Sequence, residues 1–186
     1  MSEKASNLGN PGPLGLIAFG MTTILLNLHN AGFFELASVV LAMGIFYGGL
    51  AQAIVGVLEF ARGNTFGTVA FASYGFFWLT LVAIWVLPKL GLAEATPPEY
   101  LAWYLTLWGI FTFFMFFGTL KANKVLPFVF LSLTVLFGLL AAHNFLENHF
   151  IGIIAGYVGI VCGASAIYLG LAETLEAQYE RKILPF

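Results

Sequence analysis

Charged residues are absent from six long stretches of this 186-residue chain, and each stretch is long enough to cross a lipid bilayer. A membrane-spanning helix needs about 20 mainly apolar residues. The charge-free stretches are 5–34, 36–58, 63–88, 100–120, 125–146 and 148–172. A soluble domain would instead show amphipathic helices with a polar face, or strands. The chain is therefore predicted to be an all-α integral membrane protein with six transmembrane helices.

Turn residues between the stretches predict where each helix begins and ends. Residues 1–186 are expected to form one transmembrane domain with spans at about 13–28, 36–60, 65–86, 101–120, 125–142 and 150–171. The third span is expected to stop before Pro88, because proline cannot donate a helical hydrogen bond. The segment Glu173–Lys182 is expected to continue the last helix. Gly56, Gly118 and Gly170 each precede the first charge after a span by three residues. This spacing fits either three in-line helical hairpins or coincidence, because glycine is abundant.

The basic residues predict the orientation in the membrane. Six of the seven fall on one side of the predicted topology and Lys89 falls on the other; the six are Lys4, Arg62, Lys121, Lys124, Arg181 and Lys182. Short loops rich in Lys and Arg stay in the cytoplasm. Both termini are therefore predicted to lie on the cytoplasmic side of a multi-pass protein of the cytoplasmic (inner) membrane.

Composition excludes several classes of function. Only 9% of the residues are charged and 60% are hydrophobic, whereas soluble domains carry about 25% charged residues. The net charge of −2 and the lack of a basic cluster argue against a nucleic-acid partner. Membrane lipid is the partner expected around the helices. His29, His143 and His149 lack further ligands at metal-site spacing, and no catalytic motif occurs. We expect no enzyme activity, no metal and no cofactor.

Uncharged polar residues within the spans are the candidates for a solute pathway. Thr23, Asn27 and Asn30 follow at i, i+4 and i+7, and therefore share one face of the first helix. The other candidates are Gln52, Ser132, Thr134 and Ser165. Such residues either join helices through hydrogen bonds or line a polar pathway. Because no charge lies at mid-membrane, a pathway of this kind would suit a small, weakly held solute.

Small residues recur at four-residue spacing and predict close helix packing. The pairs are Gly44 with Gly48, Gly152 with Gly156, and Gly159 with Gly163. They fit contacts within one protomer or contacts between protomers.

The segment Asn10-Pro-Gly-Pro-Leu-Gly-Leu16 resembles the signature of the acetate uptake transporter family, Asn-Pro-Ala-Pro-Leu-Gly-Leu. The matching residues are Asn10, Pro11, Pro13, Leu14, Gly15 and Leu16, and Gly12 is the one departure. Further segments that are similar to this family follow in order along the chain; they include 19–30, 44–49, 63–67, 73–75, 116–121, 130–137 and 162–168. The family includes bacterial succinate–acetate permeases and fungal acetate/ammonium relatives.

The resemblance implies a homo-hexamer in which each protomer carries its own conduit for acetate and related short carboxylates, with succinate in some members. It also implies a fold similar to the urea channels, which are built from three helical hairpins. An apolar constriction is implied at Phe19, Tyr74 and Leu133, with Ala166 lining the path nearby. The proline-containing signature is implied to lie at the cytoplasmic mouth.

These residues lead to a hypothesis for the mechanism. We expect the N–H groups of Leu14, Gly15 and Leu16 to attract anions at the mouth, and the Tyr74 hydroxyl to donate to a carboxylate. A bare carboxylate would lose its water at an apolar ring, whereas a protonated acid would pass at lower cost. Acetate movement is therefore expected to be coupled to acidity; anion conduction without a proton is the rival mechanism. The alternative functions are a conduit for a neutral solute such as urea or ammonia, and a non-transporting receptor or scaffold.

Overall fold

The computed structural model describes residues 8–186, and every regular element in this part of the chain is a helix. The helices are α1 (Gly12–Asn30), α2 (Ser38–Ile45), η2 (Phe46–Ala51), α3 (Gln52–Ala61), α4 (Thr65–Lys89), α5 (Pro98–Thr119), α6 (Val125–Leu146) and α7 (His149–Tyr179). Because α2, η2 and α3 are continuous, they form one span, and six spans are long and apolar enough to cross a membrane. The prediction of an all-α protein with six transmembrane helices is confirmed.

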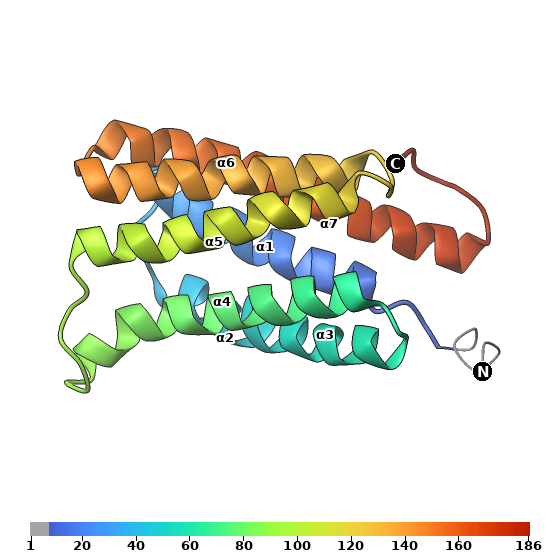
Figure 1. The fold of residues 1–186 in the computed structure, drawn as a ribbon, viewed down its shortest axis with the longest axis horizontal. Helices are drawn as coiled ribbons and strands as arrows, with labels where there is room; N and C mark the ends of the chain where they lie inside the picture. The colour runs from blue at the N-terminus through green and yellow to red at the C-terminus, as the bar shows by residue number, and fades with distance from the viewer. Residues whose placement is uncertain (1–7) are drawn as a thin grey trace.

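The helices run side by side, and α1 lies between two groups of them (Figure 1). Helices α2, η2, α3 and α4 pack together, and α5, α6 and α7 form the other group. Helix α1 packs along α7 and also touches the second span. Helices α4 and α5 follow one another in the chain, yet α5 packs chiefly on α6. The backbone of α4 packs closely against neither α5 nor α6. Side chains therefore fill the space between α4 and these two helices.

Several helix ends lie a few residues from their predicted positions, and the end of α4 contradicts a stated expectation. Helix α4 includes Pro88 and continues to Lys89, so the expectation that it stops before Pro88 is wrong. A proline in the last turn leaves little helix to disrupt, and the chain turns only at Gly91, where φ is +70°. Helix α7 runs to Tyr179, in agreement with the expected continuation of the last helix beyond Glu173, and ends where Glu180 takes a left-handed conformation with φ of +53°.

The second span is irregular in its middle. The π-helical segment η2 interrupts the α-helix and contains Gly48 and Gly49. A Cβ atom at Gly48 would lie 2.8 Å from Cγ2 of Thr22 and 2.9 Å from Cδ1 of Trp78. The missing side chain thus allows η2 to approach both α1 and α4. Helix α3 begins directly afterwards, at the buried Gln52.

Glycines bring the backbones of α1 and α7 into direct contact. A Cβ atom at Gly20 would lie 2.5 Å from the carbonyl oxygen of Gly163, and one at Gly163 would lie 2.7 Å from the carbonyl oxygen of Gly20. Gly156 meets the backbone of Ala31, and Gly159 meets the side chain of Asn27. The pair Gly159 and Gly163 therefore packs within one protomer.

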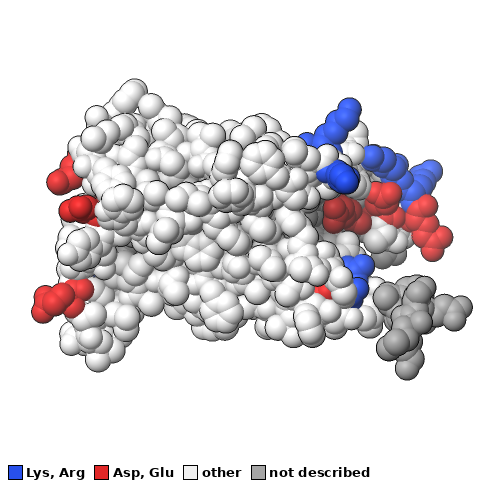
Figure 2. Space-filling view, viewed as in Figure 1, with Lys and Arg blue, Asp and Glu red and all other residues white. Residues whose placement is uncertain are grey.

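Lys and Arg side chains gather at the end of the bundle where both termini lie, whereas acidic side chains occur at both ends (Figure 2). This distribution agrees with the charge asymmetry from which we predict cytoplasmic termini.

The α1–α7 contact leads to a stability prediction. Gly20→Ala should lower the melting temperature of the purified protein in detergent, because the new methyl group meets a backbone carbonyl that cannot move independently. Overpacking of this kind costs about 1–3 kcal/mol. The measurement is thermal unfolding followed by tryptophan fluorescence.

Gly138→Ala is the matched control, because nothing lies within 4 Å of a Cβ atom at Gly138. Its melting temperature should stay level or rise, since alanine favours a helix over glycine. Equal melting temperatures for the two variants would contradict the assigned packing.

Candidate functional site

Two cavities enter the bundle from opposite ends. The proximal cavity, of about 200 Å³, lies at the end that carries the chain termini, and its lining comes from α1, α3, α4, α6 and α7 together with Asn10 and Asn64. The distal cavity, of about 170 Å³, lies among α1, α4, α5 and α6. It occupies the region where the backbones of α4 and α5 do not pack closely and only their side chains meet. A path through the bundle would have to join these two spaces.

Phe19 and Leu133 line both cavities, so they form the partition between them. Tyr74 lines the proximal cavity beside them, and its ring centroid lies 6.0 Å from that of Phe19. These side chains come from α1, α6 and α4 and are 6%, 3% and 3% exposed. Phe130 extends the apolar surface, with its ring centroid 6.0 Å from that of Tyr74. The structure thus brings together the three residues proposed for the constriction.

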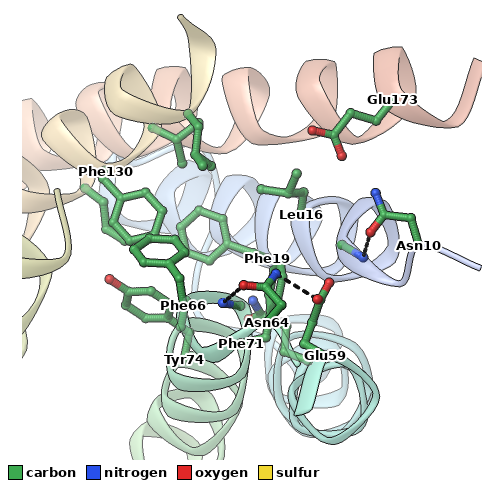
Figure 3. Close-up of a pocket in the computed structure, with 17 residues that line it drawn as sticks. Asn10, Leu16, Phe19, Glu59, Asn64, Phe66, Phe71, Tyr74, Phe130 and Glu173 are labelled. Atoms are coloured by element: carbon green, nitrogen blue, oxygen red, sulfur yellow. Dashed lines mark hydrogen bonds between the residues drawn. The ribbon is translucent and has the colours of Figure 1, made fainter. Parts of the chain in front are cut away.

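The Tyr74 hydroxyl does not face the partition, and in Figure 3 it points away from Phe19. It is hydrogen-bonded to Oγ1 of Thr112 on α5 at 3.0 Å. Oγ1 of Thr112 also lies 2.7 Å from the carbonyl oxygen of Trp108, to which it donates. The expectation that Tyr74 donates to a passing carboxylate is therefore wrong in this conformation, because its hydroxyl already has a partner.

The polar candidates on α1 line the distal cavity. Trp78, which the sequence pattern did not single out, also lines it. Thr23, Asn27 and Asn30 all line this cavity. The Asn27 amide donates to the carbonyl oxygen of Thr23 at 2.9 Å, and Asn30 donates to Oδ1 of Asn27 at 3.1 Å. Oγ1 of Thr23 and Nε1 of Trp78 are buried and have no hydrogen-bond partner among the described residues. Both residues line the cavity, so the residues of its wall include a hydroxyl and an N–H group that are not hydrogen-bonded.

Gln52 supplies a comparable group to the proximal cavity. It is 1% exposed, and its Oε1 atom is buried without a hydrogen-bond partner in the part of the chain that the structure describes. A buried amide oxygen without a partner costs free energy. A solute or a water molecule in the cavity that donates to this oxygen would recover that cost.

Four of the candidate pathway residues line neither of these cavities. Ser132 donates to the carbonyl oxygen of Phe128 at 2.7 Å and faces an apolar groove on the outside of α6 and α7. Thr134 and Ser165 donate to carbonyl oxygens of their own helices, at 2.8 and 2.7 Å. Ala166 is fully buried among core residues. A hydroxyl that donates to a carbonyl oxygen of its own helix needs no polar pathway. Ser132, Thr134 and Ser165 can therefore lie outside both cavities.

The signature segment lies at the opening of the proximal cavity. Oδ1 of Asn10 accepts hydrogen bonds from the backbone N–H of Gly12 at 3.1 Å and from the Arg62 guanidinium at 2.7 Å. Asn10 thereby ties the start of α1 to the turn between α3 and α4. Pro11 caps α1 and Pro13 is buried in its first turn. Leu16 lines the cavity, whereas Leu14 is 43% exposed.

The expectation of an anion site at the N–H groups of this segment is wrong for Gly15. The N–H group of Gly15 donates to the carbonyl oxygen of Pro11 at 3.3 Å, so it is not free to bind an anion. The Asn10 side chain likewise occupies the N–H group of Gly12. The start of α1 is closed by its own chain and shows no open anion site at these two groups.

The sequence pattern did not single out Glu59, a buried acidic residue that lines the proximal cavity. Glu59 is 1% exposed, and its carboxylate accepts from the Asn64 amide at 2.8 Å and lies 3.7 Å from the Arg62 guanidinium. Oδ1 of Asn64 caps α4 by accepting from the N–H of Gly67 at 3.0 Å. Glu173 reaches toward the cavity from α7, on the opposite side (Figure 3). The family-like segment 63–67, which contains Asn64 and Gly67, was the sequence feature that could have indicated this site.

Comparisons with known proteins identify the family. The sequence model of the GPR1/FUN34/yaaH family matches residues 1–184. The chain is 61% identical over 180 residues to the succinate-acetate/proton symporter SatP of Escherichia coli K12, which covers 97% of this chain and 96% of that protein. It is 36% identical over 167 residues to ammonia transport outward protein 2 of Saccharomyces cerevisiae, which covers 86% of this chain and 59% of the yeast protein. The structure of the bacterial acetate channel SatP is similar to it, with a TM-score of 0.96, 61% identity and coverage of 97% of this chain and 99% of the other. This chain belongs to the GPR1/FUN34/yaaH family.

Proposed function

We infer that the protein transports acetate and related short-chain carboxylates, succinate among them, across the cytoplasmic membrane through a pore in each protomer. One observation carries this inference. Two cavities approach each other from opposite ends of the bundle and share Phe19 and Leu133 as their common wall. The relatives named as a succinate-acetate/proton symporter and as an acetate channel support the choice of substrate.

The walls of the cavities suit a carboxylate that is held weakly. In the distal cavity the free N–H of Trp78 and the hydroxyl of Thr23 can both donate to carboxylate oxygens, and no Lys or Arg is among its lining residues. In the proximal cavity the free Gln52 oxygen can accept the O–H of a protonated acid. Neutral groups bind without the tight ion pair that would slow release.

The apolar partition selects for the protonated acid. At Phe19, Tyr74 and Leu133 a carboxylate would lose water and gain no hydrogen bond, because the Tyr74 hydroxyl is already bonded to Thr112. Burial of an unpaired charge is far more costly than burial of a neutral carboxylic acid. Glu59 and Glu173 also line the proximal cavity, where an ionised carboxylate would repel the anion and not the neutral acid. We therefore propose that transport is coupled to a proton.

Assembly and orientation are further proposals. We propose a homo-hexamer with both termini in the cytoplasm and its pores inside the protomers. An exposed apolar groove on α6 and α7, lined by Leu131, Val135 and Val161 among others, is available for contact with a neighbouring protomer or with lipid. In keeping with its relatives, we propose that the protein is a transporter and not an enzyme.

A conduit for ammonia or urea is the second candidate. It is favoured by the yeast relative named as an ammonia transport protein and by the uncharged lining of the distal cavity. Flux measured in parallel with acetate, succinate, urea and ammonium separates the two functions. A receptor or scaffold without transport would show no flux of any of these solutes.

The proposed proton coupling predicts a pH dependence. Uptake of labelled acetate into proteoliposomes should rise steeply as the external pH falls from 8 to 5. A carboxyl group with a pKa of about 4–5 gains about tenfold in its protonated fraction with each pH unit over most of that range. Protein-free vesicles measured at each pH provide the passive rate to subtract. A protein-dependent rate that stays flat would favour anion conduction without a proton.

The partition predicts a change in substrate size. Leu133→Ala shortens a side chain that lines both cavities and so widens the partition. Uptake of lactate relative to acetate should rise about tenfold, because one methylene group in an apolar pocket changes selectivity by about tenfold or more. Leu131→Ala on the same helix is the control, because Leu131 is exposed and lines the outer groove. Unchanged selectivity in Leu133→Ala would remove Leu133 from the constriction.

The free N–H group in the distal cavity predicts a change in affinity. Trp78→Phe keeps an aromatic ring but removes the donor, so the acetate concentration at half-maximal uptake should rise roughly fivefold, as expected for one lost hydrogen bond. Trp103→Phe is the matched control, because Trp103 is exposed on α5 and packs against Phe145. Equal effects of the two substitutions would contradict a binding role for Trp78.

A further inference from the structure

Thr112 lies behind the constriction and does not line either cavity among the described residues. It is fully buried on α5, and its Oγ1 atom lies 3.0 Å from the hydroxyl oxygen of Tyr74 on α4. Because α5 packs chiefly on α6 and not on α4, side chains must hold these two helices in register. The Tyr74–Thr112 hydrogen bond joins them at the depth of the constriction.

The direction of this hydrogen bond follows from the number of protons available. A threonine hydroxyl has one proton, and Oγ1 of Thr112 lies 2.7 Å from the carbonyl oxygen of Trp108, which can only accept. The Thr112 proton is therefore used within α5. Tyr74 must donate to Thr112, so the phenol proton is held away from the pore.

Aromatic contacts alone leave the Tyr74 ring some freedom. Besides Phe19 and Phe130, its neighbours are Phe111, with ring centroids 5.6 Å apart, and Trp108, with ring centroids 6.3 Å apart. Contacts between rings tolerate a range of angles, whereas a buried hydrogen bond has a preferred direction. The bond to Thr112 is thus the contact that sets where the Tyr74 hydroxyl points.

We propose that Thr112 is a positioning residue of the constriction. It holds the Tyr74 ring in place and accepts the hydrogen bond from the Tyr74 hydroxyl, so that the side chains of the partition present only carbon to the solute. This proposal rests on the proposed transport function and adds to it the origin of selectivity for the protonated acid. Thr112 acts through Tyr74 and does not touch the solute.

Thr112→Val tests the proposal because valine has nearly the shape of threonine but cannot accept a hydrogen bond. The Tyr74 hydroxyl then has no partner in a buried site, which is costly, and it gains a partner by turning toward the cavity. A donor in the partition would help an ionised carboxylate to cross. We expect the ratio of acetate uptake at pH 8 to that at pH 5 to rise about fivefold, the factor that corresponds to about 1 kcal/mol.

The experiment compares wild type, Thr112→Val, Thr112→Ser, Tyr74→Phe and the double variant Tyr74→Phe with Thr112→Val in proteoliposomes. Thr112→Ser keeps the hydroxyl and should keep the wild-type ratio. In the Tyr74→Phe background there is no phenol to release, so Thr112→Val should leave the ratio unchanged. A wild-type ratio in Thr112→Val, or an equal shift in both backgrounds, would overturn the proposal.

Thermal unfolding of the same five proteins in detergent gives a readout without transport. Thr112→Val should lower the melting temperature when Tyr74 is present and lower it less in the Tyr74→Phe background. Equal losses in the two backgrounds would overturn the proposal even where Thr112→Val gives too little folded protein for vesicles. If wild type shows no acetate uptake above protein-free vesicles, the proposed function fails, whereas the thermal cycle still tests the hydrogen bond.

Discussion

The contact between the backbones of α1 and α7 is the constraint on which the conduit depends. Gly20 and Gly163 each leave no room for a side chain, so α1 is held against α7 along one face. The adjoining part of α1 then carries Phe19 and Thr23 toward the cavities, and Asn27 lines the distal cavity where it also packs against Gly159 of α7. Inside lipid, where apolar side chains gain little from leaving water, such close packing is a main source of helix association. The position of the pore-lining residues of α1 is thus a consequence of its packing on α7.

Most of the fold could be predicted from the sequence because the bilayer imposes a single rule on every span. Each charge-free stretch had to be a helix, since backbone groups in lipid must be paired within the segment. The departures arose where local geometry decides. Helix α4 continues through Pro88, because a proline in the last turn breaks little. The π-helical turn at Gly48 and Gly49 depends on how closely Thr22 and Trp78 approach, and no spacing in the sequence reports that distance.

The candidate site was predictable only in part, for a related reason. Spacing alone placed Thr23, Asn27 and Asn30 on one face, and all three line the distal cavity. Spacing could not tell whether a hydroxyl is already bonded within its own helix, as those of Ser132, Thr134 and Ser165 are. It also could not show that Tyr74 turns its hydroxyl to Thr112. Nor could spacing show that Glu59 is buried, because its burial depends on the contacts with Asn64 and Arg62.

The arrangement of polar groups explains how a pore can be open to small acids and closed to ions. Neutral donors and acceptors occur on both sides of the partition, at Thr23, Trp78 and Gln52. At the partition itself, the Tyr74 hydroxyl is already hydrogen-bonded to Thr112. An ion would find a weak site on each side but no replacement for its water between them. A carboxylic acid can give up its charge by binding a proton, and it then crosses as a small neutral molecule. Selectivity of this kind requires no charged residue at mid-membrane; it requires only that every polar group near the partition be turned away or already paired.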